Sequence, residues 1–84
     1  MTKTAALALI SAKFSAVLNT EIRGHLTIQV VDSAGTISML AEGTTEDLAR
    51  ARAFVAAHLS AQLTYKHSYD ADEDGPAADY YVVA

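Results

Sequence analysis

The sequence predicts an α+β fold, a single small domain in which two helices pack on one face of an antiparallel sheet. Three observations predict it. Alternating apolar and polar residues over 25–42 indicate a β-hairpin, helical spacing of apolar residues on either side indicates two helices, and a tyrosine- and valine-rich segment closes the chain. The expected order is αββαβ, in one domain because 84 residues are too few for two cores.

The first helix is predicted over about residues 4–18. Its opposite side carries small residues, among them Ala5, Ala12 and Ala16, which would let a second helix approach closely. This side fits either a weakly polar solvent face of an alanine-rich protein or the interface of a homodimer. The apolar stripe of this helix consists of Leu7, Ile10, Phe14, Val17 and Leu18.

The hairpin is predicted to have strands at about 25–31 and 36–42, joined by a turn at residues 32–35. Ile28 and Val30 are expected at the centre of its apolar face, which both helices would cover. The expected cross-strand pairs are Val31 with Thr36, Val30 with Ile37, Ile28 with Met39 and Leu26 with Ala41.

The second helix is predicted over about residues 45–64, because Thr44 stands three residues before Asp47 as an N-cap. Arg52 lies inside its apolar arc, where the aliphatic stem is expected to pack while the charged head reaches water or a carboxylate. Phe54 lies off the stripe, either against the first helix or the last strand or on a partner surface. The buried stripe consists of Leu48, Ala51, Val55, Leu59 and Leu63.

A polar, acidic loop is predicted over residues 66–78, followed by a third strand over about 79–84 at one edge of the hairpin. The loop is long for a compact domain, which is typical of a functional or mobile segment.

Within this loop, Asp70-x-Asp72-x-Asp74-Gly75 matches the first half of an EF-hand-type calcium loop. The second half departs from that pattern, because Tyr81 stands where a bidentate glutamate should close the coordination shell; Asp79 could substitute only in part. No cofactor is expected, and calcium held by Asp70, Asp72 and Asp74 is the alternative.

The sequence contains no pattern typical of an enzyme. His25, His58 and His67 do not have metal-site spacing, and neither a glycine-rich phosphate loop nor a nucleophile elbow is present. The absence of cysteine excludes thiol chemistry and suits the cytoplasm, where we expect the protein. No segment approaches the roughly 20 apolar residues of a membrane span.

The formal net charge of −4 argues against direct nucleic-acid binding and favours a protein partner with a basic surface. In size, acidity and lack of enzyme motifs the chain resembles the inhibitors carried by phages and mobile elements, such as anti-CRISPR and anti-restriction proteins, although no motif carries this likeness. The acids would imitate a nucleic-acid backbone in the partner's groove. A calcium module and a structural homodimer or subunit are the alternatives. The predicted partner-binding residues are Phe54, Tyr65, Tyr69, Asp70, Asp72, Glu73, Asp74 and Asp79.

Overall fold

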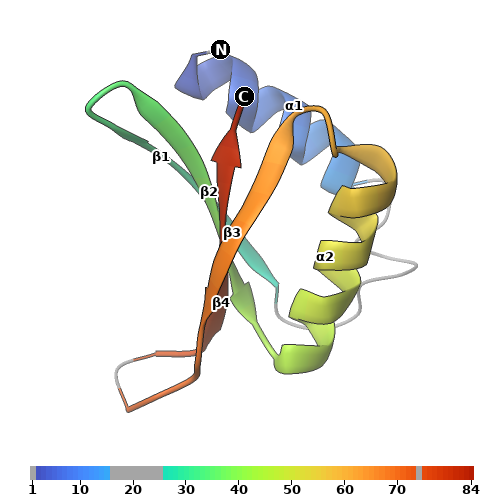
Figure 1. The fold of residues 1–84 in the computed structure, drawn as a ribbon, viewed down its shortest axis with the longest axis vertical. Coiled ribbons are helices and arrows are strands. Elements are labelled where there is room, and N and C mark those ends of the chain that lie inside the picture. Colours follow the sequence, from blue (N-terminus) through green and yellow to red (C-terminus); the bar gives the residue numbers. More distant parts are fainter. Residues whose placement is uncertain (1, 16–25, 74) are drawn as a thin grey trace.

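The computed structural model describes residues 2–15, 26–73 and 75–84, and shows a four-stranded antiparallel sheet of order β1-β2-β4-β3 with two helices on one side (Figure 1). The predicted α+β class and αββαβ order are confirmed, with one strand more than predicted. Neither helix in these ranges is long and apolar enough to cross a membrane. The elements are α1 Lys3–Ser15, β1 Thr27–Ser33, β2 Thr36–Gly43, α2 Thr45–His58, β3 Leu63–Tyr69 and β4 Ala77–Val83.

Helix α1 packs against β1 through a narrower face than its sequence predicts. Ala6 and Ile10 are buried in the core, whereas Leu7 is 46% exposed, so its assignment to the buried stripe is wrong. The physical reason is that the helix rests on the sheet along the line from Ala6 to Ile10, one turn apart, and Leu7 lies to the side of this line. The side chain of Phe14 and residues 16–18, including Val17 and Leu18, lie outside the described part.

The β1–β2 hairpin has a tighter turn than predicted. Ser33 pairs with Thr36, so only Ala34 and Gly35 form the turn, with positive φ angles of 53° and 84°. Two-residue turns of this kind match the twist of antiparallel strands, which explains the difference. The register is shifted by two residues from the predicted one, and a shift of two leaves every side chain on the expected face.

Helix α2 ends at His58, so the prediction that it continues to about residue 64 is wrong. A turn at residues 60–62 follows, and the Leu63 amide donates to the Leu59 carbonyl at 2.8 Å. Leu59 and Leu63 are both buried, as their helical spacing predicts, but the turn brings them there. Residues 63–69 then pair with β4, and the predicted loop shortens to residues 70–76.

Strand β4 is the predicted C-terminal strand, paired with β2 at the edge of the hairpin. Met39 on β2 lies opposite Tyr81 on β4, and neither side chain is exposed. Val30 is buried as predicted, but Ile28 is only half-buried, so placing Ile28 at the centre of the core is wrong. The extra strand β3 moves the centre of the sheet toward β2 and β4 and away from β1.

Met39→Ala is expected to lower the free energy of unfolding by about 2–5 kcal/mol, because it leaves a cavity in the core. Gln29→Ala, on the exposed face of β1, is the control and should change this free energy by less than about 0.5 kcal/mol. Urea denaturation followed by circular dichroism measures both. Equally small effects of the two substitutions would contradict the central position of Met39.

Candidate functional site

Strand β3 contains a bulge that changes which of its side chains face the helices. Tyr65 lies opposite Tyr81, and His67 lies opposite the neighbouring Tyr80, so Lys66 is an extra residue in the pairing. Regular alternation would place the side chains at 65 and 67 on the same face. Because of the bulge, Tyr65 faces the helices and His67 faces away from them.

A buried carboxylate lies between the sheet and α2. Asp79 on β4 has no exposed surface, and its Oδ2 lies 2.9 Å from both Nε and Nη2 of Arg52 on α2. Its Oδ1 accepts a 2.5 Å hydrogen bond from the hydroxyl of Ser68. Since the single proton of Ser68 is used in that bond, Tyr65 must donate its hydroxyl to Ser68 Oγ, also at 2.5 Å. We call Arg52, Tyr65, Ser68 and Asp79 the buried network after the buried carboxylate at its centre; the other three residues are partly exposed.

The Arg52 side chain is 42% exposed, so its guanidinium reaches the Asp79 carboxylate from the protein surface. Its guanidinium carbon lies 5.1 Å from the centroid of the Tyr65 ring, within the range of a cation–π contact. The hydrogen bond to Asp79 raises the pKa of Arg52 above its ordinary value. The prediction that the head of this arginine reaches water or a carboxylate is confirmed, and the carboxylate is that of Asp79.

Tyr81 lies beside the buried network, with its ring in an edge contact with Tyr65 at 5.7 Å between centroids. It has no exposed surface, and its hydroxyl has no hydrogen-bond partner among the described residues. Burial, followed by the negative charge of Asp79, raises the pKa of Tyr81 to about 12. The hydroxyl therefore remains protonated at neutral pH and is a donor without an acceptor.

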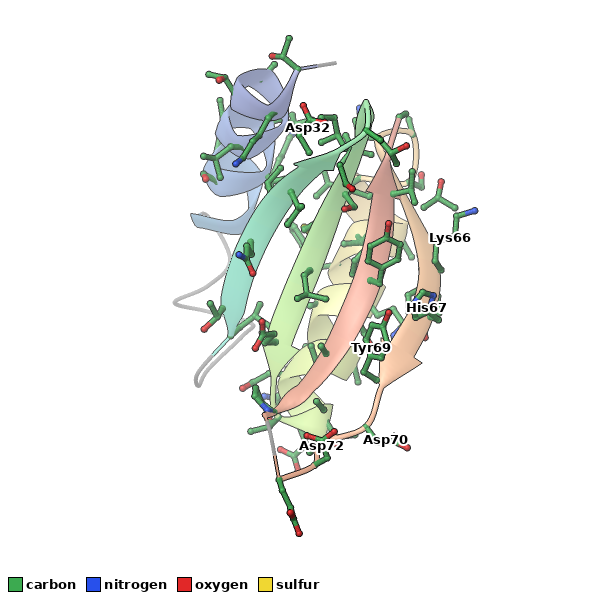
Figure 2. The ribbon with its side chains drawn as sticks, turned by 90° about the vertical axis from the view of Figure 1, so that its left-hand side faces the viewer. Asp32, Lys66, His67, Tyr69, Asp70 and Asp72 are labelled. Carbon is green, nitrogen blue, oxygen red and sulfur yellow. The ribbon has the colours of Figure 1, made fainter. Side chains whose placement is uncertain are left out.

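The opposite face of the sheet carries an aromatic cluster, defined as His67, Tyr69 and Tyr80. The His67 ring stacks on the Tyr80 ring, with centroids 5.0 Å apart and an interplanar angle of 25°. The His67 Nε2 lies 2.6 Å from the hydroxyl of Tyr69, which is 52% exposed. Figure 2 shows His67 and Tyr69 on this face, which neither α1 nor α2 covers.

The β3–β4 connection carries exposed acids at the same end of the sheet, and we call Asp70, Asp72 and Glu73 the acidic tip. The turn is closed by the Gly75 amide, which donates to Asp72 Oδ1 at 3.0 Å. Figure 2 shows Asp70 and Asp72 at the end of the sheet farthest from Asp32. Asp70 and Glu73 form no ion pair within the described ranges.

A hollow of about 590 Å³ adjoins the acidic tip, lined in part by Ala71 and Pro76. Among the described residues that line it, Glu42 alone is ionisable. Glu42 pairs with Ala78, which in turn pairs with Tyr69, so this carboxylate lies on the same face as the aromatic cluster. The surface around the tip is therefore both acidic and aromatic.

The calcium half-motif is only partly contained in the described residues, because Asp74 lies outside them. In the rest, no group of three histidine, aspartate or glutamate side chains is placed to hold a metal ion. Asp79 is held by Arg52 and Ser68 on the inner face, away from the acidic tip. Calcium binding stays a prediction.

Two of the predicted partner-binding residues are buried. Phe54 is 6% exposed and packs in the core, with its ring centroid 5.0 Å from that of His58. Asp79 is fully buried because it shares the inward-facing side of β4 with Tyr81. Neither is accessible on the surface of the folded chain.

The remaining predicted residues divide between the two faces. Tyr65 lies on the inner face of the sheet beside Arg52. Tyr69 lies on the outer face, and the acidic tip lies at the end of the sheet farthest from Asp32. Sequence reasoning missed His67 and Ser68, because nothing in the sequence marks the bulge. The alternation over 77–83, which places Asp79 on the side of Tyr81, was the available signal for the buried network.

No protein-family model, no curated protein and no solved structure matches the chain.

The raised pKa of Tyr81 predicts a loss of stability at alkaline pH. Below pH 10 the hydroxyl is protonated in both states; as the pH rises toward about 12, only the unfolded chain ionises Tyr81, which favours unfolding. The contribution is on the order of 2–3 kcal/mol. Urea denaturation from pH 8 upward should show a steeper decline for the wild type than for Tyr81→Phe. Parallel curves would contradict the burial of this hydroxyl.

Proposed function

We propose that the protein is a non-enzymatic binding protein that inhibits or regulates a partner stoichiometrically by covering an arginine-bearing surface of that partner. The observation that carries the proposal is the juxtaposition of the aromatic cluster and the acidic tip at one end of the open sheet face. Rings and carboxylates side by side are the two groups that bind guanidinium ions.

The chemistry of the surface favours arginine over lysine as the partner's side chain. A guanidinium is planar, so it can stack on an aromatic ring while its edge donates two hydrogen bonds to a carboxylate. Tyr69 is half exposed and is followed directly by Asp70, which provides a ring and an acid in adjacent positions. A lysine ammonium would use the charge but not the planar geometry.

The charges of the chain support attraction toward a basic partner. Arg50 and Arg52 form ion pairs with Asp47 and Asp79, respectively, whereas Asp70 and Glu73 form no ion pair with any described residue. The net charge of −4 therefore acts largely through exposed carboxylates, which accelerate association with a basic surface. Nucleic-acid-binding grooves are surfaces of this basic kind, and a protein that carries one is the partner class we propose.

The placement of Ser68 and His67 supports binding over catalysis. Ser68 donates its proton to Asp79 on the inner face, and His67 faces the outer side of the same strand. The strand separates the hydroxyl from the imidazole, so they do not form a nucleophile and base pair.

The test uses a short arginine-rich peptide as a probe, with a lysine-rich peptide of equal length for comparison. The protein is expected to bind the arginine peptide more tightly. The double variant Asp70→Asn, Glu73→Gln should weaken binding about tenfold and flatten its salt dependence, because two exposed charges are removed. Fluorescence anisotropy at several salt concentrations measures both effects.

Asp32→Asn, at the far end of the sheet, is the matched control and should bind like the wild type. Tyr69→Ala should reduce the preference for arginine over lysine, since it removes the exposed ring. Equal affinity of wild type, double variant and control would refute the proposed surface. A partner captured from the native host should be lost with the double variant and kept with Asp32→Asn.

A further inference from the structure

The hollow of about 590 Å³ beside the acidic tip is a concave site that the proposed partner surface does not yet use. Its walls come from the end of β2, the start of α2 and the β3–β4 connection, which lie at the same end of the sheet (Figure 1). Ala71 and Pro76 provide an apolar wall, and Glu42 provides the one charge among the described lining residues. A hollow of this volume admits a whole side chain or a small ligand.

Glu42 is accessible and has no partner in the described part of the chain. The residue is half-buried, so its carboxylate is only partly hydrated. It forms neither an ion pair nor a hydrogen bond with another described side chain, whereas Asp47 and Asp79 each pair with an arginine. A cation with N–H donors would compensate this charge through charge-assisted hydrogen bonds.

Three threonines are the other polar side chains that line the hollow. The Thr44 hydroxyl accepts a hydrogen bond from the Asp47 amide at 3.1 Å, as the N-cap of α2. Thr27 and Thr45 are exposed, and their hydroxyl groups have no partner among the described residues. Their oxygens can accept hydrogen bonds from a ligand, so they add two acceptors to the carboxylate of Glu42.

The charges around the hollow favour a cation over an anion. No lysine, arginine or histidine occurs among its described lining residues. The start of α2 carries a partial positive charge, but Glu46 in the first turn of this helix opposes it. Together with Glu42 and the acidic tip, these charges would repel an anion.

The register of the sheet makes the hollow continuous with the proposed partner surface. Glu42 pairs with Ala78 and Ala78 pairs with Tyr69, so the three residues form one row across β2, β4 and β3. Because neighbouring strands are about 4.8 Å apart, the backbone positions of Glu42 and Tyr69 are roughly 10 Å apart. A partner that covers the aromatic cluster can therefore extend a neighbouring side chain into the hollow.

We infer that the hollow binds one arginine side chain of that partner, an inference that rests on the proposed function for the identity of the occupant. Glu42 accepts two parallel hydrogen bonds from the guanidinium, and Thr27 and Thr45 accept bonds from its remaining N–H groups. The aliphatic stem packs against Ala71 and Pro76. Arginine fits better than lysine, because its planar head presents five donors that reach several acceptors at once.

The test is a titration of the protein with N-acetylarginine amide, monitored by amide chemical shifts. N-acetylcitrulline amide has a similar shape without the charge. The arginine compound should cause saturable shifts at Gly43, Thr45 and Ala71, and the citrulline compound should bind about tenfold more weakly. Glu42→Gln should weaken binding of the arginine compound about tenfold and leave the melting temperature unchanged, because the carboxylate it replaces has no partner.

Glu46→Gln removes an equal charge from the first turn of α2, outside the hollow, and is the matched control. It should bind the arginine compound like the wild type. Equal affinity of Glu42→Gln and Glu46→Gln would overturn the assignment. Equal binding of the citrulline compound, or tighter binding of inorganic phosphate at the same amides, would also overturn it.

The arginine-rich peptide separates this inference from the proposed function. If Glu42→Gln binds that peptide like the wild type while Asp70→Asn, Glu73→Gln binds it more weakly, the partner surface stands and the hollow is not its arginine site. If the arginine compound binds at Glu42 but the arginine-rich peptide binds no better than the lysine-rich one, the hollow is an arginine site and the proposed function is wrong.

Discussion

The buried charge of Asp79 is the constraint on which the rest of the structure depends. A carboxylate without exposed surface is stable only if donors surround it, and here they come from two separate elements. Arg52 reaches it from α2, and Ser68 reaches it from β3. One side chain therefore connects the helix layer to the two C-terminal strands, and it restricts how α2 and β3 can sit on β4.

The bulge at Lys66 provides one of the hydrogen-bond donors that the buried Asp79 carboxylate needs. It brings Ser68 to the inner face, opposite Asp79, and in doing so turns His67 to the outer face, opposite Tyr80. The same irregularity thus completes the buried network and assembles the aromatic cluster.

The sequence predicts the architecture well where periodicity is strong and burial is one-sided. The hairpin faces and the start of α2 at Thr44 follow from alternation and capping. The end of α2 could not be predicted in this way, because Leu59 and Leu63 keep helical spacing although a turn and a strand contain them. Only pairing with β4, a contact distant in sequence, determines that residues 63–69 are a strand.

The candidate site was predictable in part. The acids of the tip stand out in the sequence and are exposed, and Arg52 is recognisable as a charge within an apolar arc. Asp79 is predicted as the first residue of the C-terminal strand and grouped with the loop acids as a partner-binding residue, yet the pleat of β4 turns it inward. A charge at the boundary between loop and strand is ambiguous until the register is known.

Hydrogen exchange in the variant Arg52→Met tests most directly whether the buried network holds β3 in place. The account predicts a large loss of protection for the β3 amides that pair with β4, a much smaller loss in β1 and β2, and recovery in the double variant Arg52→Met, Asp79→Asn, which removes the unpaired charge. Full protection of β3 in Arg52→Met, or an equal loss in all four strands, would contradict it.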